Sequence, residues 1–190
     1  MSVSRRALLR MAGGACVSGV SLSLGAPVLA APAVIGLREL NCRTLSFDSY
    51  YTGEQLKQIE YWVEGEYVPE ALDEINYALR DWRTGDVHPI APQLLDLLYQ
   101  LGTSLETNCQ FELISAFRSP KTNAMLHELD AGVATNSLHM KGQAIDISLP
   151  GRPLHKVHET ALAMQAGGVG YYPDSNFVHV DVGRVRHWQD

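Results

Sequence analysis

Two short segments of this 190-residue chain carry residue types that bind metal ions. The first contains His139 and Asp146, which lie seven positions apart with Gly142 between them. The second segment, residues 177–181, places His179 inside an alternating apolar run. Two imidazoles and one carboxylate form a three-ligand set for zinc that leaves one coordination position open for water. Because hydrolytic zinc sites need that open position, the pattern predicts a zinc centre with hydrolytic chemistry.

The neighbours of these candidates indicate how strands would present them. Successive side chains of a strand point to opposite faces. Asp146 lies between two isoleucines and His179 between two valines, so the apolar neighbours can face a core while the polar groups face a cleft. Asp181 shares a strand face with His179, and His139 lies in a loop that enters the first strand. An isolated histidine or aspartate is more often a solvated side chain, but the combined pattern favours a metal centre on rigid elements.

Apolar periodicity predicts the elements that must position these residues. Alternation at 39–47 and 54–63, with a Thr-Gly turn signal between them, predicts a hairpin. Helical spacing predicts one helix that begins at Pro69 and ends by Gly85, and a second across residues 92–102. The other expected elements are strands at 111–116, 144–149, 169–172 and 177–182 and helices at 121–129 and 153–166. Because helices and strands do not alternate regularly, this order favours a single α+β domain.

The first 30 residues have the composition of an export signal. Arg5 and Arg6 form a twin-arginine pair, a glycine- and alanine-rich apolar stretch follows, and small residues up to Ala30 suit a signal peptidase. The sequence therefore predicts a twin-arginine signal peptide at residues 1–30, one domain at residues 31–190, and a periplasmic location. Stable membrane insertion is not expected, because the apolar stretch is short and interrupted by glycines.

Net charge excludes two classes of partner. The formal net charge of the chain is −6, and it becomes −9 without residues 1–30, which contain three arginines and no acidic residue. An acidic surface argues against binding to nucleic acid and against docking on anionic lipid. Two cysteines remain, Cys42 and Cys109, in different segments. They could pair in an oxidising compartment, but we expect two free thiols.

The motifs also resemble those of a known superfamily. The residues that carry the resemblance are Ser137-x-His139-x-x-Gly142-x-Ala144-x-Asp146, preceded by Ser115-Ala-Phe-Arg118-Ser119 and followed by His179-Val-Asp181. This pattern resembles the zinc peptidases related to D-alanyl-D-alanine carboxypeptidases and hedgehog domains. Within that superfamily the chain is most similar to the murein endopeptidase K (YcbK-like) type, and the likeness spans nearly all of residues 31–190.

The resemblance implies a fold, a reaction and a set of residue roles. The fold would be a zinc peptidase domain with a small antiparallel sheet and helices packed on it. Zn²⁺ would be bound by His139, Asp146 and His179. Arg118 would lie at the substrate, where a guanidinium can hold a carboxylate or polarise a carbonyl. Ser137 would hydrogen-bond to a ligand or to the substrate. The reaction would be hydrolysis of peptidoglycan stem-peptide cross-links, with the bridge between two meso-diaminopimelate residues favoured.

One position departs from the pattern of many relatives. They carry Glu or Asp as general base three residues before the last zinc histidine, where this chain has Asn176. Asp181 is the best substitute for the base, although it could instead orient the imidazole of His179. Asp174 and His187 remain competitors. Two alternatives therefore stay open, a catalytically silent metal-containing module that binds the cell wall and a periplasmic zinc carrier.

Overall fold

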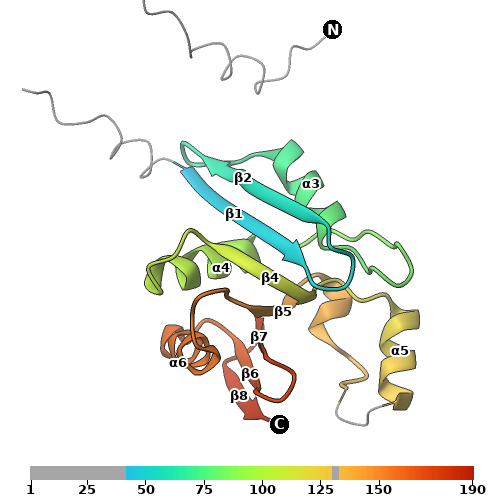
Figure 1. Ribbon diagram of the computed structural model, residues 1–190. Coiled ribbons are helices and arrows are strands. Elements are labelled where there is room, and N and C mark those ends of the chain that lie inside the picture. The colour runs from blue at the N-terminus through green and yellow to red at the C-terminus, as the bar shows by residue number, and fades with distance from the viewer. Residues whose placement is uncertain (1–41, 130–132) are drawn as a thin grey trace, which may run out of the picture. The chain divides into compact units, whose positions relative to one another are not determined.

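The computed structural model describes residues 42–129 and 133–190, which form one α+β domain (Figure 1). The predicted α+β class is therefore confirmed. The predicted signal peptide at residues 1–30 and the first residues of the predicted domain lie outside the described part of the chain. Among the helices that are described, none is both long and apolar enough to cross a bilayer.

Most of the elements form close to their predicted ranges. The strands are β1 (Cys42–Ser49), β2 (Gln55–Val63), β3 (Glu66–Tyr67), β4 (Gln110–Ser115), β5 (Ala144–Ser148), β6 (Gly168–Tyr172), β7 (Phe177–Asp181) and β8 (Arg186–Gln189). The helices are α3 (Pro69–Ala78), α4 (Pro92–Ser104), α5 (Pro120–Leu129) and α6 (Leu154–Met164), with the short 3₁₀ helix η2 (Leu138–Lys141). Both α3 and α4 have proline in the first turn, where its fixed φ and missing N–H are favourable.

Two boundaries differ from the sequence prediction. Helix α3 ends at Ala78 instead of near Gly85, because the next two backbone N–H groups turn back to carbonyls within the last turn of the helix. Trp82 consequently lies in a loop and is not part of the helical stripe. Strand β8 was not predicted, because its charged and polar residues lack the apolar alternation that marks a strand.

The sheet is larger than expected and is mixed. Its strand order is β3-β2-β1-β4-β5-β7-β6-β8. β1 pairs with β4 and β6 pairs with β8 in parallel, whereas the other neighbours are antiparallel. The observed sheet therefore differs from the expected small antiparallel sheet in its size and in its two parallel strand pairs. The connection from β1 to β4 contains β2, β3, α3 and α4, and a connection of this length allows the chain to return in a parallel orientation.

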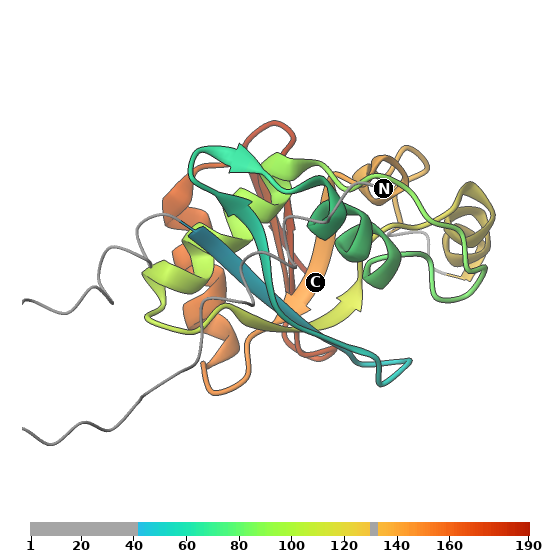
Figure 2. The same cartoon turned by 90° about the horizontal axis from the view of Figure 1, so that it is seen from above.

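Apolar side chains hold helices against one face of the sheet. α4 packs against β1 and α6, and α6 packs against β6 and β7, as Figure 2 shows from above. On this face a row of paired residues crosses from β4 to β7 through Leu113, Ile147 and Val178. A leucine stripe of α4 (Leu94, Leu95, Leu98 and Leu101) is fully buried in the same core. Because strand side chains alternate, the next residue along each strand points to the opposite face.

Cys42 and Cys109 do not form a disulfide with each other. Cys109 is buried and Cys42 is half-buried. Burial raises the pKa of the Cys109 thiol, so this group is protonated at neutral pH.

Candidate metal centre

The face of the sheet opposite the α4–α6 layer carries a row of polar and aromatic groups. Ser115, Asp146, His179, Gly170 and Trp188 are consecutive partners across β4, β5, β7, β6 and β8. A Cβ on Gly170 would lie 2.6 Å from the Trp188 indole, so glycine is what allows the indole to cover this strand. The Trp188 ring then lies 5.1 Å from the His179 imidazole. The strand register therefore places the carboxylate of Asp146 and the imidazole of His179 side by side on the adjacent strands β5 and β7.

His139 reaches the same point from η2, just before β5. The Ser137 hydroxyl accepts a hydrogen bond from the backbone N–H of His139 and caps the first turn. Gly142 ends the turn with φ +61°, and a Cβ there would lie 2.2 Å from the Pro89 carbonyl oxygen. His139 Nδ1 donates to the Ala116 carbonyl at 2.7 Å, because a carbonyl only accepts. This bond leaves the lone pair of His139 Nε2 pointing at the two strand residues.

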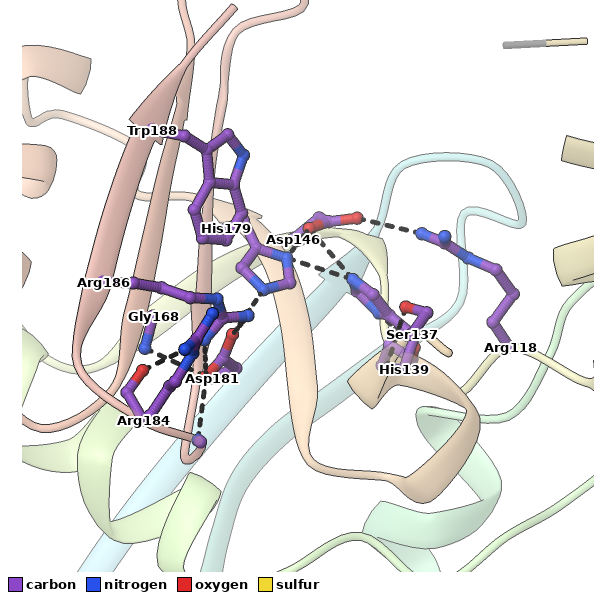
Figure 3. A network of polar contacts seen from close by, with 12 residues as sticks. Arg118, Ser137, His139, Asp146, Gly168, His179, Asp181, Arg184, Arg186 and Trp188 are labelled. Atoms are coloured by element: carbon purple, nitrogen blue, oxygen red, sulfur yellow. Dashed lines mark hydrogen bonds and ion pairs between the residues drawn. The ribbon is translucent and has the colours of Figure 1, made fainter. Parts of the chain in front are cut away.

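The three predicted ligands meet in space (Figure 3). His179 Nδ1 lies 2.8 Å from Asp146 Oδ1 and 3.1 Å from His139 Nε2. His139 Nε2 lies 3.3 Å from the same carboxylate oxygen. All three side chains are buried, and one ligand atom from each lies within 4.8 Å of the others. Two imidazole nitrogens and a carboxylate oxygen that converge at this distance fit a divalent cation, and zinc accepts this donor set.

Electrostatics around the three residues favour a positive charge between them. Burial raises the pKa of Asp146, but the contacts with His139 and His179 outweigh burial and hold this pKa below its ordinary value. Burial lowers the pKa of His139. Burial also lowers the pKa of His179, but hydrogen bonds with Asp146 and Asp181 overcome this effect and raise it. The carboxylate is therefore ionised and compensated by its neighbours at neutral pH.

The three side chains line a cavity of about 610 Å³. Ser137 and Arg118 also line it, so the structure brings both of these predicted site residues next to His139, Asp146 and His179. Aromatic side chains form part of the wall, namely Tyr172, Phe177 and Trp188. Tyr172 stacks on Phe177, and its hydroxyl accepts a hydrogen bond from Trp188 Nε1 at 2.8 Å.

Comparison with known proteins agrees with this geometry. Residues 38–188 match the family Peptidase_M15_2, described as "Peptidoglycan L,D-endopeptidase MepK". The chain belongs to this family. It is 41% identical over 185 residues to the peptidoglycan L,D-endopeptidase MepK of Escherichia coli strain K12, with 97% of each chain covered. It is 40% identical over 169 residues to the probable peptidoglycan L,D-endopeptidase MepK of Haemophilus influenzae, which covers 88% of this chain and 90% of the relative. The predicted resemblance is therefore confirmed.

Asp181 of this MepK family member lies behind His179. Asp181 Oδ2 accepts from His179 Nε2 at 3.0 Å, on the nitrogen that faces away from Asp146 and His139. The same oxygen accepts from Arg186 Nη2 at 2.7 Å. Its Oδ1 accepts from the backbone N–H groups of Gly168 and Gly183 and from Arg186 Nη1. Asp181 is fully buried and does not line the cavity.

Arg118 has hydrogen-bonding capacity left over in this MepK family member. Its Nη2 lies 3.4 Å from both Ser115 Oγ and Asp146 Oδ2, which are long contacts. Its Nε is buried and has no hydrogen-bond partner among the described residues. Burial lowers the pKa of Arg118, which nevertheless stays charged. The guanidinium thus lies beside the three converging ligands with two long contacts and one buried donor that has no partner among the described residues.

The other residues considered for the base lie elsewhere in the MepK fold. Asn176 has φ +55° in the β6–β7 turn, a left-handed conformation that asparagine tolerates well. The turn therefore explains the residue type at this position. Neither Asn176 nor Asp174 lines the cavity. His187 lies next to Trp188 in β8 and therefore points to the other side of the sheet.

Sequence reasoning missed two residues near the ligands. Arg186 holds both oxygens of Asp181, and Asp190 contributes to the cavity lining. Both depend on β8, whose sequence gives no strand signal. The signal that could have found Arg186 is the short Arg-His-Trp segment at residues 186–188, which contains chemistry-bearing side chains close to Asp181 in the sequence.

Proposed function

We propose that this protein is an exported, zinc-dependent endopeptidase that cleaves the peptidoglycan bridge between two meso-diaminopimelate residues. Membership of the family makes it a murein endopeptidase and a metallopeptidase. The observation that carries the finer proposal is the convergence of His139, Asp146 and His179 beside Arg118 in one cavity. Both relatives are named as L,D-endopeptidases of peptidoglycan, which supports the chosen cross-link.

The proposal gives each residue a role. His139, Asp146 and His179 hold zinc, which supplies an activated water and polarises the scissile carbonyl when it is bound. Arg118 binds a carboxylate of the substrate beside the scissile amide, because its buried guanidinium has a donor to spare. Ser137 holds the turn of His139 and offers its hydroxyl to the cavity.

Asp181 is assigned an orienting role in preference to the base role. Its oxygens are occupied by Arg186, by two backbone N–H groups and by the outer nitrogen of His179. A carboxylate in this position keeps the proton on His179 Nε2 and leaves Nδ1 for the metal. Among the described residues that line the cavity, the carboxylate other than Asp146 belongs to Asp190, which is therefore the candidate proton acceptor.

The catalytically silent module is disfavoured. Asn176 was the feature that supported it, and the conformation of the β6–β7 turn accounts for that residue. A zinc carrier is disfavoured as well, because carriage of a metal needs no guanidinium with a spare donor in the same cavity.

Product analysis on defined cross-linked muropeptides tests the proposed function. We expect the zinc-loaded protein to cut the bridge between two meso-diaminopimelate residues, as detected by mass spectrometry. Chelation should abolish cleavage and added zinc should restore it. Asp146→Asn should lose both bound zinc and cleavage, whereas His155→Ala, at an exposed histidine of α6, should behave like the wild type. Retained cleavage in the chelated protein would contradict zinc dependence, and equal cleavage of D-alanyl bridges would contradict the choice of bond.

A further inference from the structure

Three exposed aromatic side chains gather away from the cavity, where the β1–β2 turn meets the loop after α3. Tyr50, Tyr51 and Trp82 are 63%, 51% and 38% exposed. Tyr51 stacks on Trp82 with ring centroids 4.6 Å apart and planes 18° apart, and Tyr50 meets Tyr51 edge-on at 5.0 Å. The Arg83 guanidinium lies 4.1 Å from the Trp82 ring. We call these four residues the aromatic shelf.

The shelf is held in place without being part of the core. None of its rings belongs to the buried cluster of the domain. The β1–β2 turn projects beyond the end of β4 (Figure 2, cyan). Glu54 at the base of this turn accepts two hydrogen bonds of 2.9 Å from Arg80, in the chain just before Trp82. Contiguous exposed aromatic surface that is fixed in this way is typical of a binding site.

A short chain of contacts joins the shelf to the metal centre. Asp81 is buried and accepts from the backbone N–H of Arg83 at 3.0 Å and from that of Ser119 at 2.9 Å. Ser119 follows Arg118, whose guanidinium reaches Asp146. Asp81 therefore links the shelf to the chain segment that carries Arg118.

We infer that the aromatic shelf binds the glycan strand of peptidoglycan while the stem peptide occupies the cavity. This inference rests on the proposed function, because only a peptidoglycan substrate carries both parts. The stem peptide is short and is joined covalently to the glycan, so the sugars stay within one stem length of the bond that is cut. Flat aromatic faces complement the C–H faces of pyranose rings. Arg83, which makes no ion pair among the described residues, can donate to acetamido and hydroxyl oxygens.

The chemistry of the shelf favours sugar over peptide. Peptidoglycan stems are short and rich in carboxylates, and they offer little apolar surface to three aromatic rings. A pyranose ring presents that surface together with the oxygen atoms that a guanidinium recognises. A second stem peptide would instead need several cations, and the shelf contains one, Arg83.

Binding of peptide-free glycan strands tests the inference, because these strands lack the bond that the enzyme cuts. We expect Tyr51→Ala and Trp82→Ala each to weaken binding of such strands by about tenfold, as measured by calorimetry. Tyr77→Ala is the matched control. Tyr77 is 59% exposed and lies under the Arg80 guanidinium at 4.2 Å, but it belongs to α3 outside the shelf. Tyr50→Ala, at the most exposed ring, provides a second variant if Trp82→Ala perturbs the loop.

The outcomes separate the shelf from the proposed reaction. We expect digestion of whole sacculi by the shelf variants to slow relative to cleavage of glycan-free cross-linked peptides. Unchanged glycan affinity in Tyr51→Ala and Tyr50→Ala would overturn the inference, and so would an equal loss in Tyr77→Ala. A loss that appears only with glycan-free peptides would make the shelf a peptide site and would overturn it as well. Glycan binding by a protein that cuts no diaminopimelate bridge would refute the proposed function and leave the shelf intact.

Discussion

At the scale of single residues, the two nitrogens of His179 have different partners. Nδ1 faces Asp146 and His139, whereas Nε2 donates to Asp181, which Arg186 holds from the other side. Histidine ligands of metals commonly donate their second N–H to a carboxylate, which fixes the ring and its tautomer. The sequence left Asp181 between two roles, and this arrangement favours the orienting role.

Substitution of two aspartates distinguishes orientation from proton transfer. Asp181→Asn should weaken zinc binding by about 10- to 100-fold, because the imidazole loses its anionic partner. Asp190→Asn should leave zinc affinity unchanged and lower kcat. Competition with a chromophoric chelator and rate profiles at saturating zinc measure the two effects. An Asp181→Asn protein with normal zinc affinity but low kcat at saturating zinc would return the base role to Asp181.

At the scale of elements, the site depends on close backbone approaches as well as on side chains. η2 turns back at Gly142, which packs against the Pro89 carbonyl ahead of α4. Gly170 lets Trp188 of β8 lie across β6 toward His179. These contacts fix where His139 and His179 point, so backbone geometry controls the distances between ligands.

Gly142 and Gly151 both have positive φ but differ in the space around them. Replacing each with alanine therefore separates the cost of backbone strain from the cost of a steric clash. Gly151 has φ +80° with open space where a Cβ would lie, so Gly151→Ala should cost about 1–2 kcal/mol from the left-handed conformation alone. Gly142→Ala has the same strain, and its Cβ would also collide with the Pro89 carbonyl. We expect a loss of about 2–5 kcal/mol and weaker zinc binding. Urea denaturation measures both variants, and equal losses would contradict the role of the close approach.

At the scale of the whole molecule, Asp81 ties the first half of the chain to the second. It lies between α3 and α4 and accepts the backbone N–H of Ser119, where α5 begins. Burial raises the pKa of Asp81, but hydrogen bonds from Thr122, Ser119 and Arg83 outweigh burial and lower it. The Asp81 carboxylate therefore holds two segments in place. One is the segment after β4 that carries Arg118, and the other is the loop that carries Trp82 and Arg83.

The lowered pKa of Asp81 predicts a pH dependence of stability. Because the folded-state pKa lies below that of the unfolded chain, this stabilisation is complete above about pH 4 and is lost as pH falls through the folded-state pKa. Asp81→Asn should cost about 1–3 kcal/mol at pH 7, because its amide presents a donor where two backbone N–H groups need an acceptor. Denaturation at pH 7 and at pH 3 should show the gap between variant and wild type narrowing on the acid side. A gap that stays constant would contradict this role.

The sequence by itself determined the ligand types and most of the secondary structure. His139, Asp146 and His179 could be selected because their spacing and apolar neighbours are local properties, and strand alternation carries a carboxylate and a histidine to one face. The hairpin and the α4 and α6 helices followed from periodicity for the same reason.

Only the tertiary structure decided the partners that come from distant segments. The parallel pairing of β1 with β4, the placement of Arg186 beside Asp181, and the stacking of Tyr51 on Trp82 each join residues that local sequence patterns do not connect. Strand pairing depends on the packing of whole elements, so nothing in the sequence around these residues specifies it. The nitrogen of His179 that faces Asp146 and His139 was decided in the same way, because both of these residues come from other segments of the chain.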